Sequence, residues 1–302
     1  MATSPTSDQL LVIIDPAARC TDGESVRIAK DVLSAGAAST KVCLPEDPEE
    51  FARVLSRRGS RRPVVVGDDR ALIRAVALLH RQRALAECVL SVVPVGASLS
   101  VAHALGVPRG VVAAARAALD GTERRLDVLI DDSDGVVLGA LRIPPVPLTP
   151  HSPDDETGDP DRADHTDMVE GAGLAHAGRH WLRTYQSLVR TLVPSRPSRL
   201  SPAPAPPGPA RLRIEVDGVT LIDLDQPVAA VSVSPGPSGT AIVEVRPLSL
   251  GADAAPLRAR GHTVTVSGTD FHYRADTTVA GPVRRRTWTA REGALGLMLP
   301  GR

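Results

Sequence analysis

The sequence predicts an α/β domain with a parallel sheet and flanking helices, followed by a β-sandwich domain. Over residues 9–125, unbroken apolar runs alternate with stretches of helical periodicity. Beyond residue 210, the apolar runs are short and separated by turn residues, and several alternate polar and apolar positions. Hydrophobic residues make up 42% of the 302 residues, which is enough for each domain to bury a core.

The α/β domain is expected over residues 9–125. Its predicted strands are Leu10–Ile14, Val42–Leu44, Val64–Val66 and Val89–Val93. Helices are predicted over Glu24–Leu33, from Pro48 to about Arg58, and over Asp69–Leu79. Continuous apolar strands that alternate with helices are typical of a parallel sheet covered on both faces.

The middle of the chain connects the two domains. Residues 126–143 are predicted to form two strands, Leu126–Ile130 and Val136–Ile143, which return to the second domain. Residues 144–173 are rich in Pro, Asp, Glu and Gly without periodicity, so we expect a disordered insert. A helix is predicted within residues 174–194, followed by a Pro-rich linker over residues 195–210.

The β-sandwich is expected over residues 211–301, where short apolar runs are separated by turns. The predicted strands are Leu212–Val216, Val219–Ile222, Val228–Val233, Ala241–Val245, Thr263–Val266, Phe271–Arg274, Arg286–Thr289 and Leu295–Leu299.

Composition excludes several classes of partner. The 35 basic and 35 acidic residues cancel and only 2% of residues are aromatic, so nucleic acid is not an expected partner. Cys20, Cys43 and Cys88 are odd in number and far apart, which argues against a disulfide framework and a zinc site. No signal peptide and no transmembrane segment of about 18 apolar residues is evident, so a cytoplasmic protein is expected. The oligomeric state is left open.

Two strand-to-helix turns are the most informative segments. Val64–Leu72 and Pro94–Leu99 each begin with an apolar run or a proline, pass through a glycine, and lead into a helix-like pattern. Glycine at such a turn lets backbone N–H groups approach a phosphate at a helix N-terminus. Two further segments are informative: Asp15–Arg19, directly after the first strand, and Phe271–Leu299 near the C-terminus.

In the order of these segments, the chain resembles the diacylglycerol kinase catalytic-domain family of soluble bacterial lipid kinases. Asp15–Arg19 resembles that family's NPxxG turn, and Gly67–Leu72 resembles GGDGTL. Pro94–Pro108 is similar, without a gap, to PLGTGNDFARSLGIP, and Phe271–Leu299 resembles the segment that carries DGE.

The resemblance implies a nucleotide-binding-type α/β domain beside a lipid-binding β-sandwich. It implies a nucleotide or lipid ligand, and ATP with Mg²⁺ as cofactors if the chain is active. By this resemblance the nucleotide-binding residues are Asp15, Gly67, Asp69 and Gly96. Asp276 is implied as a catalytic acid, and no metal ligands are assigned.

The sequence departs from the family at most positions that carry the chemistry. In the first loop, Asp68, Arg70 and Ala71 replace two glycines and a hydroxyl. A carboxylate beside a triphosphate is repulsive, by about 4 kcal/mol at roughly 4 Å in an effective dielectric of about 20. In the second loop, residues 97–100 (Ala-Ser-Leu-Ser) replace Thr-Gly-Asn-Asp. Thr278 stands where DGE has its glutamate, and a threonine cannot act as a general base at neutral pH.

Three hypotheses follow. The leading one is a catalytically degenerate lipid-kinase homologue that acts as a binding or regulatory protein. The alternatives are an active ATP-dependent kinase of diacylglycerol or a related substrate, and a structural interaction module. Two further candidates are weak: a histidine-rich stretch around His165 has no regular metal-ligand spacing, and Asp270 is expected to be a solvated turn residue.

Overall fold

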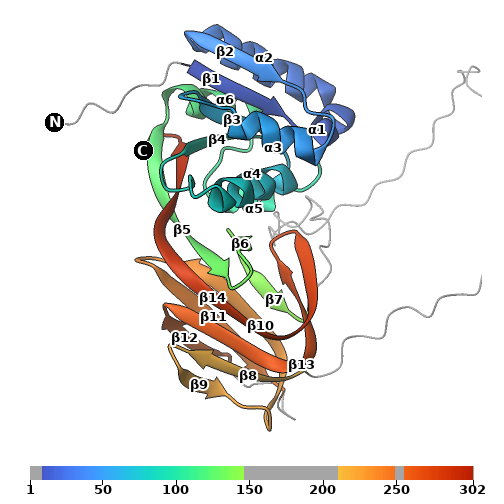
Figure 1. Ribbon diagram of the computed structural model, residues 1–302, viewed down its shortest axis with the longest axis vertical. Helices are drawn as coiled ribbons and strands as arrows, with labels where there is room; N and C mark the ends of the chain where they lie inside the picture. Colours follow the sequence, from blue (N-terminus) through green and yellow to red (C-terminus); the bar gives the residue numbers. More distant parts are fainter. Residues whose placement is uncertain (1–8, 146–209, 249–254, 302) are drawn as a thin grey trace, which may run out of the picture. The chain divides into compact units, whose positions relative to one another are not determined.

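The computed structural model describes residues 9–145, 210–248 and 255–301 (Figure 1). The predicted insert at 144–173, helix at 174–194 and linker at 195–210 lie outside the described residues, except for residues 144, 145 and 210. The histidine-rich stretch around His165 also lies outside them. Within the described ranges, no helix is both long and apolar enough to cross a membrane.

Four strands of the first part of the chain pair in parallel. They are β1 (Gln9–Ile14), β2 (Ser39–Cys43), β3 (Arg62–Gly67) and β4 (Val89–Pro94), in the spatial order β2-β1-β3-β4. The predicted apolar runs form the interiors of β1, β3 and β4, because each is almost completely buried. The second strand is Ser39–Cys43 rather than Val42–Leu44, and Leu44 is half exposed beyond its end.

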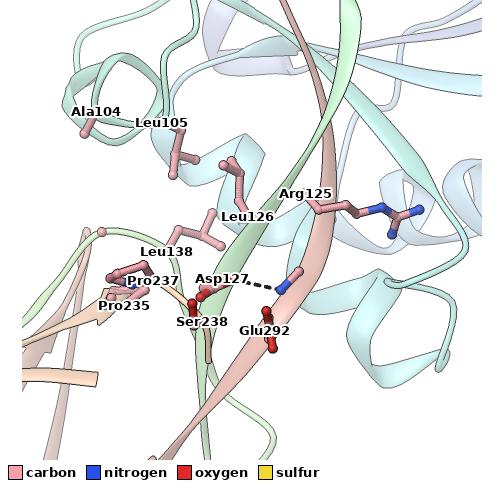
Figure 2. A pocket seen from close by; sticks show the side chains of 13 residues that line it. Ala104, Leu105, Arg125, Leu126, Asp127, Leu138, Pro235, Pro237, Ser238 and Glu292 are labelled. Atoms are coloured by element: carbon pink, nitrogen blue, oxygen red, sulfur yellow. Dashed lines mark hydrogen bonds between the residues drawn. The ribbon is translucent and has the colours of Figure 1, made fainter. Parts of the chain in front are cut away.

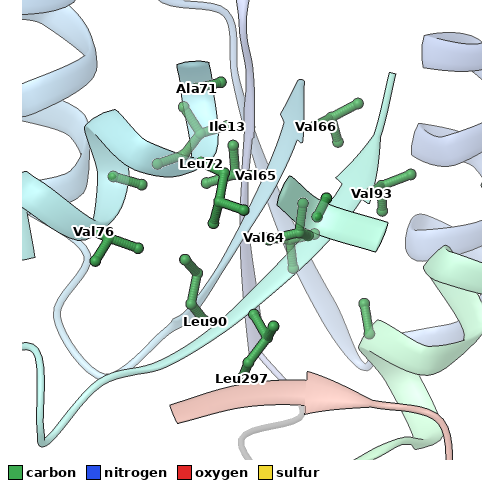
Figure 3. Close-up of a cluster of buried hydrophobic side chains, with 14 of the residues drawn as sticks. Ile13, Val64, Val65, Val66, Ala71, Leu72, Val76, Leu90, Val93 and Leu297 are labelled. Atoms are coloured by element: carbon green, nitrogen blue, oxygen red, sulfur yellow. The ribbon is translucent and has the colours of Figure 1, made fainter. Parts of the chain in front are cut away.

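Within the described residues, four helices connect these strands and two more follow β4. They are α1 (Pro16–Thr21), α2 (Gly23–Gly36), α3 (Pro48–Ser56), α4 (Asp69–Arg81), α5 (Ser100–Ala104) and α6 (Val111–Asp120). The first four begin after an aspartate whose side chain accepts a hydrogen bond from a backbone N–H of the first turn. Leu72 and Val76 of α4 pack into a buried cluster with Val65 and Leu90 (Figure 3).

The remaining strands pair mainly antiparallel. They are β5 (Thr122–Asp131), β6 (Val136–Val137), β7 (Leu141–Ile143), β8 (Ala210–Val216), β9 (Val219–Ile222), β10 (Pro227–Gly236), β11 (Thr240–Pro247), β12 (Leu257–Gly261), β13 (Thr263–Ala275) and β14 (Thr278–Leu299). They surround a second hydrophobic cluster. In this cluster Trp288 is fully buried and meets Tyr273 edge-on, with ring centroids 5.2 Å apart.

Strand β14 joins the antiparallel strands to the parallel ones. It pairs with β13 and β5 in antiparallel register, and its residues Gly296 and Leu297 pair in parallel with Val89 and Leu90 of β4. Leu297 therefore lies in the cluster of Figure 3, whereas Trp288 lies in the second cluster. The β-sandwich was predicted as a separate unit, but its strands form one hydrogen-bonded network with β1 to β4.

Several predicted strands differ from the observed ones. Arg286–Thr289 and Leu295–Leu299 are parts of the single strand β14, which continues through an irregularity near Gly293. Thr263–Val266 and Phe271–Arg274 likewise merge into β13. The predicted strand Val136–Ile143 is instead interrupted between β6 and β7. Strand β12 was not predicted, because Leu257–Gly261 is rich in arginine and has no apolar run; it pairs by its backbone at a sheet edge.

Candidate functional site

The predicted site residues lie around the carboxyl ends of the parallel strands. Asp15 follows β1, Gly67 ends β3, and Gly96 follows β4. A Cβ atom added to Gly67 would lie 2.7 Å from the Cβ of Ala71 and 3.0 Å from the Cβ of Asp15. Gly67 is therefore needed because the first turn of α4 packs closely against the end of β1.

Asp15 is held by its own helix and by an arginine. The residue is 5% exposed, and its side chain accepts a hydrogen bond from the N–H of Ala17, at 2.9 Å, at the start of α1. The other carboxylate oxygen lies 2.7 Å from Nη1 of Arg74. The guanidinium of Arg74 in turn lies 5.6 Å from the ring centre of Phe51. Both oxygens of Asp15 thus have partners within the chain, and Arg74 was not identified from the sequence.

Asp68 caps the helix that follows the first glycine turn. Its Oδ1 accepts hydrogen bonds from the N–H groups of Arg70, at 3.0 Å, and Ala71, at 3.1 Å. These N–H groups belong to the helix N-terminus where an anion would bind in a phosphate turn. Gly96 lies against this cap with φ of 135°, and a Cβ there would be 2.9 Å from the Cβ of Asp68. The two loops are therefore packed together around a carboxylate of the chain itself.

Asp69 is completely buried and joins the first loop to the second. Its carboxylate accepts hydrogen bonds from the hydroxyls of Ser98 and Ser100, at 3.1 and 3.2 Å. It also accepts from the N–H groups of Val101 and Ala102, both at 3.0 Å. Asp69 therefore caps α5, whose own N-cap residue, Leu99, supplies no side-chain hydrogen bond.

The serines of the second loop have a role that sequence comparison alone did not identify. Ser98 and Ser100 were noted only as replacements of a glycine and an aspartate, whereas both donate to Asp69. The carbonyl of Ser98 also accepts the N–H of Asp69 at 2.8 Å. A serine at the start of a helix is a common capping residue, and that signal could have indicated a structural role.

Asp276 holds the loop between β6 and β7. It is 8% exposed and adopts a φ of 49°. Its carboxylate accepts hydrogen bonds from three consecutive N–H groups, those of Leu138 (2.8 Å), Gly139 (2.8 Å) and Ala140 (3.1 Å). This contact explains why the predicted strand 136–143 is interrupted, because these three N–H groups bind a side chain instead of a neighbouring strand.

Burial dominates the ionisation of Asp276. Removal from water raises the pKa of its carboxyl, the three backbone N–H groups act in the opposite direction, and the charge of Asp69 adds to the rise. The loop lies against α5, because a Cβ at Gly139 would be 3.0 Å from Oδ1 of Asp276 and 4.0 Å from Cγ2 of Val101. The segments around Asp69, Gly96 and Asp276, which are far apart in the sequence, therefore meet around α5.

The other acidic and hydroxyl candidates are on the surface. Thr278 begins β14 and is exposed. Asp270 is exposed as expected and pairs with Arg284 at 3.2 Å, but it lies at an irregularity within β13 and not in a turn. Among the described residues around this edge, Asp15, Asp69 and Asp276 use both carboxylate oxygens for contacts within the chain.

A pocket of about 600 Å³ adjoins the loop held by Asp276 (Figure 2). Leu105, Leu126 and Leu138 form its apolar wall, and Asp127 and Glu292 lie on the polar side. The carboxylate of Asp127 accepts the N–H groups of Gly239, at 2.8 Å, and Gly293, at 2.7 Å, and so fixes the β10–β11 turn beside β14. The pocket is thus bordered by elements that are held in place by buried or half-buried carboxylates.

Comparison with known proteins shows a fold but no sequence family. No protein-family model and no curated protein matches the sequence. Three solved structures from Bacillus anthracis str. Sterne, described as diacylglycerol kinases and in two cases only provisionally, are similar in fold. Two have TM-scores of 0.65 and 0.64 with 14% identity, and one has 0.65 with 13% identity. The matches cover 97–99% of this chain and 97–98% of those chains.

Proposed function

We propose that this protein is a lipid-kinase homologue that has lost phosphotransfer and acts as a binding or regulatory protein. The proposal rests on the observation that its carboxylates accept hydrogen bonds from the chain itself. Asp68 occupies the N-terminus of α4, and Asp69 and Asp276 accept seven hydrogen bonds between them from the chain. Groups engaged in this way do not offer free oxygens to a metal ion or to a substrate hydroxyl.

The similarity of fold to diacylglycerol kinases supports a ligand of the same general kind, a nucleotide or a lipid. The pocket of Figure 2 favours the lipid, because three leucines line one side. Its volume of about 600 Å³ is in the range of small-molecule sites. The alternative of an active ATP-dependent kinase requires the loop around Asp69 or that around Asp276 to open and release its carboxylate.

The deciding experiment is a thermal titration with Mg-ATP, with a phosphotransfer assay on diacylglycerol. We expect no phosphorylated product from the wild-type protein, and a smaller Mg-ATP-dependent rise in its melting temperature than in a variant whose α4 N-terminus is free. Asp68→Gly removes the carboxylate from the N-terminus of α4, and we expect this variant to gain Mg-ATP binding and a higher melting temperature with ligand.

The control variant is Asp47→Gly. Asp47 caps α3 by accepting the N–H of Glu50 at 2.6 Å. Asp47→Gly therefore removes a helix cap, as Asp68→Gly does, but at α3 instead of α4. This variant should gain no nucleotide binding. Nucleotide-dependent stabilisation of the wild-type protein together with turnover on diacylglycerol would overturn the proposal and support the active kinase.

A further inference from the structure

A second pocket lies near the amino ends of β3 and β4, whereas the candidate site lies at the carboxyl ends of the parallel strands. Its volume is about 640 Å³. Its basic wall is formed by Arg58, Arg61 and Arg62, from the turn between α3 and β3. The other wall includes Cys88, at the start of β4, and Met298 of β14. This region shares no lining residue with the pocket of Figure 2 and contains none of the residues of the candidate site.

Two of the three arginines have positive charges that the described part of the chain does not neutralise. Arg58 and Arg61 are half-buried, and neither has a carboxylate within 4.0 Å in the ranges that the structure describes. Arg58 donates to two neutral oxygens, the carbonyl of Leu55 at 3.3 Å and Oε1 of Gln82 at 3.5 Å, and its guanidinium also contacts the Cys88 thiol. The Nε atom of Arg61 is buried and has no hydrogen-bond partner among the described residues.

The rest of the pocket does not supply the missing negative charge. Burial raises the pKa of the Cys88 thiol, although the charge of Arg58 acts against this, so the thiol remains neutral at physiological pH. The rim carries Glu87 and Glu123, which are both exposed. Glu123 is paired with Arg125 at 2.6 Å. Arg62 is fixed by its hydrogen bonds to Ser91 and to the carbonyl of Ala118, which gives this wall a defined geometry.

We propose that this arginine pocket binds a phosphate-bearing small molecule. Arg58 and Arg61 both line the pocket, so a phosphate bound there would neutralise their charges through charge-assisted hydrogen bonds. Guanidinium groups bind phosphate through two parallel N–H donors, and two uncompensated positive charges favour a dianion over a monocarboxylate. The pocket volume fits a small molecule. This inference is independent of the proposed function at the other edge of the sheet.

Calorimetric titration of the full chain with inorganic phosphate and with pyrophosphate tests the proposal, with acetate at matched ionic strength as the monoanion control. We expect saturable binding of both phosphates and none of acetate. Arg61→Gln should weaken binding by about tenfold to a hundredfold, as expected for the loss of a charge-assisted hydrogen bond. Glu87→Gln should tighten binding, because it removes a negative charge from the rim.

The matched control is Arg57→Gln. Arg57 is exposed and does not line the pocket, so this variant loses the same charge but should bind phosphate as tightly as the wild type. Arg61→Lys keeps the charge but not the planar fork, so it should bind weakly while melting like the wild type. Lack of saturable binding to the wild-type protein would overturn the proposal. Equal losses in Arg57→Gln and Arg61→Gln would also overturn it, because they would indicate a diffuse effect of charge.

Discussion

Individual buried carboxylates organise the structure around the carboxyl ends of the parallel strands. Asp15, Asp69 and Asp276 are each less than 9% exposed, and donors from other segments surround each carboxylate. Removing such an acceptor leaves several buried donors unsatisfied, and each of these costs about 1–3 kcal/mol. At the residue scale, these side chains therefore act mainly as structural anchors.

Asp69→Asn should lower the free energy of unfolding by about 3 kcal/mol, because the amide loses the negative charge and turns an NH₂ group toward donors. Urea denaturation measures this change. Asp120→Asn is the control, because Asp120 is exposed at the end of α6, and its effect should stay within about 0.5 kcal/mol. Equal effects of the two substitutions would contradict an anchoring role for Asp69.

His103 in α5 should make stability depend on pH. Burial lowers the pKa of its imidazole, the charge of Arg109 lowers it further, and Asp69 opposes both. The folded protein therefore binds this proton only at a lower pH than the unfolded chain, whose imidazole titrates near pH 6.5. This contribution to stability is complete above pH 6.5 and is lost as the pH falls from 6.5 toward the folded-state pKa.

Urea denaturation measures the free energy of unfolding above and below pH 6.5. We expect this free energy to fall less in His103→Gln than in the wild type as the pH is lowered. His272, which is exposed and shows no such burial, gives the control substitution His272→Gln. An identical pH dependence of the wild type and His103→Gln would show that another group is responsible.

At the element scale, the turn between β10 and β11 is held beside β14 by one side chain. Asp127 accepts the N–H groups of Gly239 and Gly293, which have φ angles of 65° and 55°. Asp127→Ala should therefore increase amide hydrogen exchange at these two glycines, by more than at neighbouring amides. Asp223→Ala, which changes an exposed loop residue, should leave both rates unchanged. Unchanged exchange in Asp127→Ala would contradict the proposed tie.

Elements with an apolar or capping signature could be predicted, and those held by distant partners could not. Leu10–Ile14 and Val64–Val66 are strands because their side chains are buried on both faces, and α4 begins at Asp69 after a capping aspartate. The break at residues 138–140 depends on Asp276, whose position is set by the fold and not by nearby sequence. Periodicity reports local burial and cannot report such a contact.

The same limit applies to the candidate site. The resemblance predicted Asp15, Gly67, Asp69, Gly96 and Asp276 as site residues, and their roles in binding or catalysis remain predictions. The sequence could not indicate that Arg74 pairs with Asp15, because 59 residues separate them. Nor could it indicate that the hydroxyls of the two serines of the second loop both donate to Asp69.

At the scale of the whole molecule, β14 contributes to both hydrophobic clusters, and we therefore expect them to unfold as one cooperative unit. Trp288 belongs to one cluster and Leu297 to the other, and a continuous strand connects them. Leu297→Ala should cost about 2–5 kcal/mol and should lower the midpoint seen by Trp288 fluorescence and by circular dichroism equally. A Trp181→Phe background leaves Trp288 as the only tryptophan.

Val219→Ala is the control for this prediction, because Val219 is 71% exposed on β9 and should change neither midpoint by much. Two separate transitions after Leu297→Ala, with Trp288 fluorescence unaffected, would show that the clusters unfold independently.

The long strand β14 also has a consequence for synthesis of the protein on the ribosome. Strand β4 is made early, but its partner along this edge, at Gly296 and Leu297, is made only after most of the chain. At about 5–20 residues per second, the edge of β4 waits about 10–40 s for that partner. During this interval one edge of β4 has no strand partner, so we expect the nascent chain to be more prone to aggregation than the finished protein.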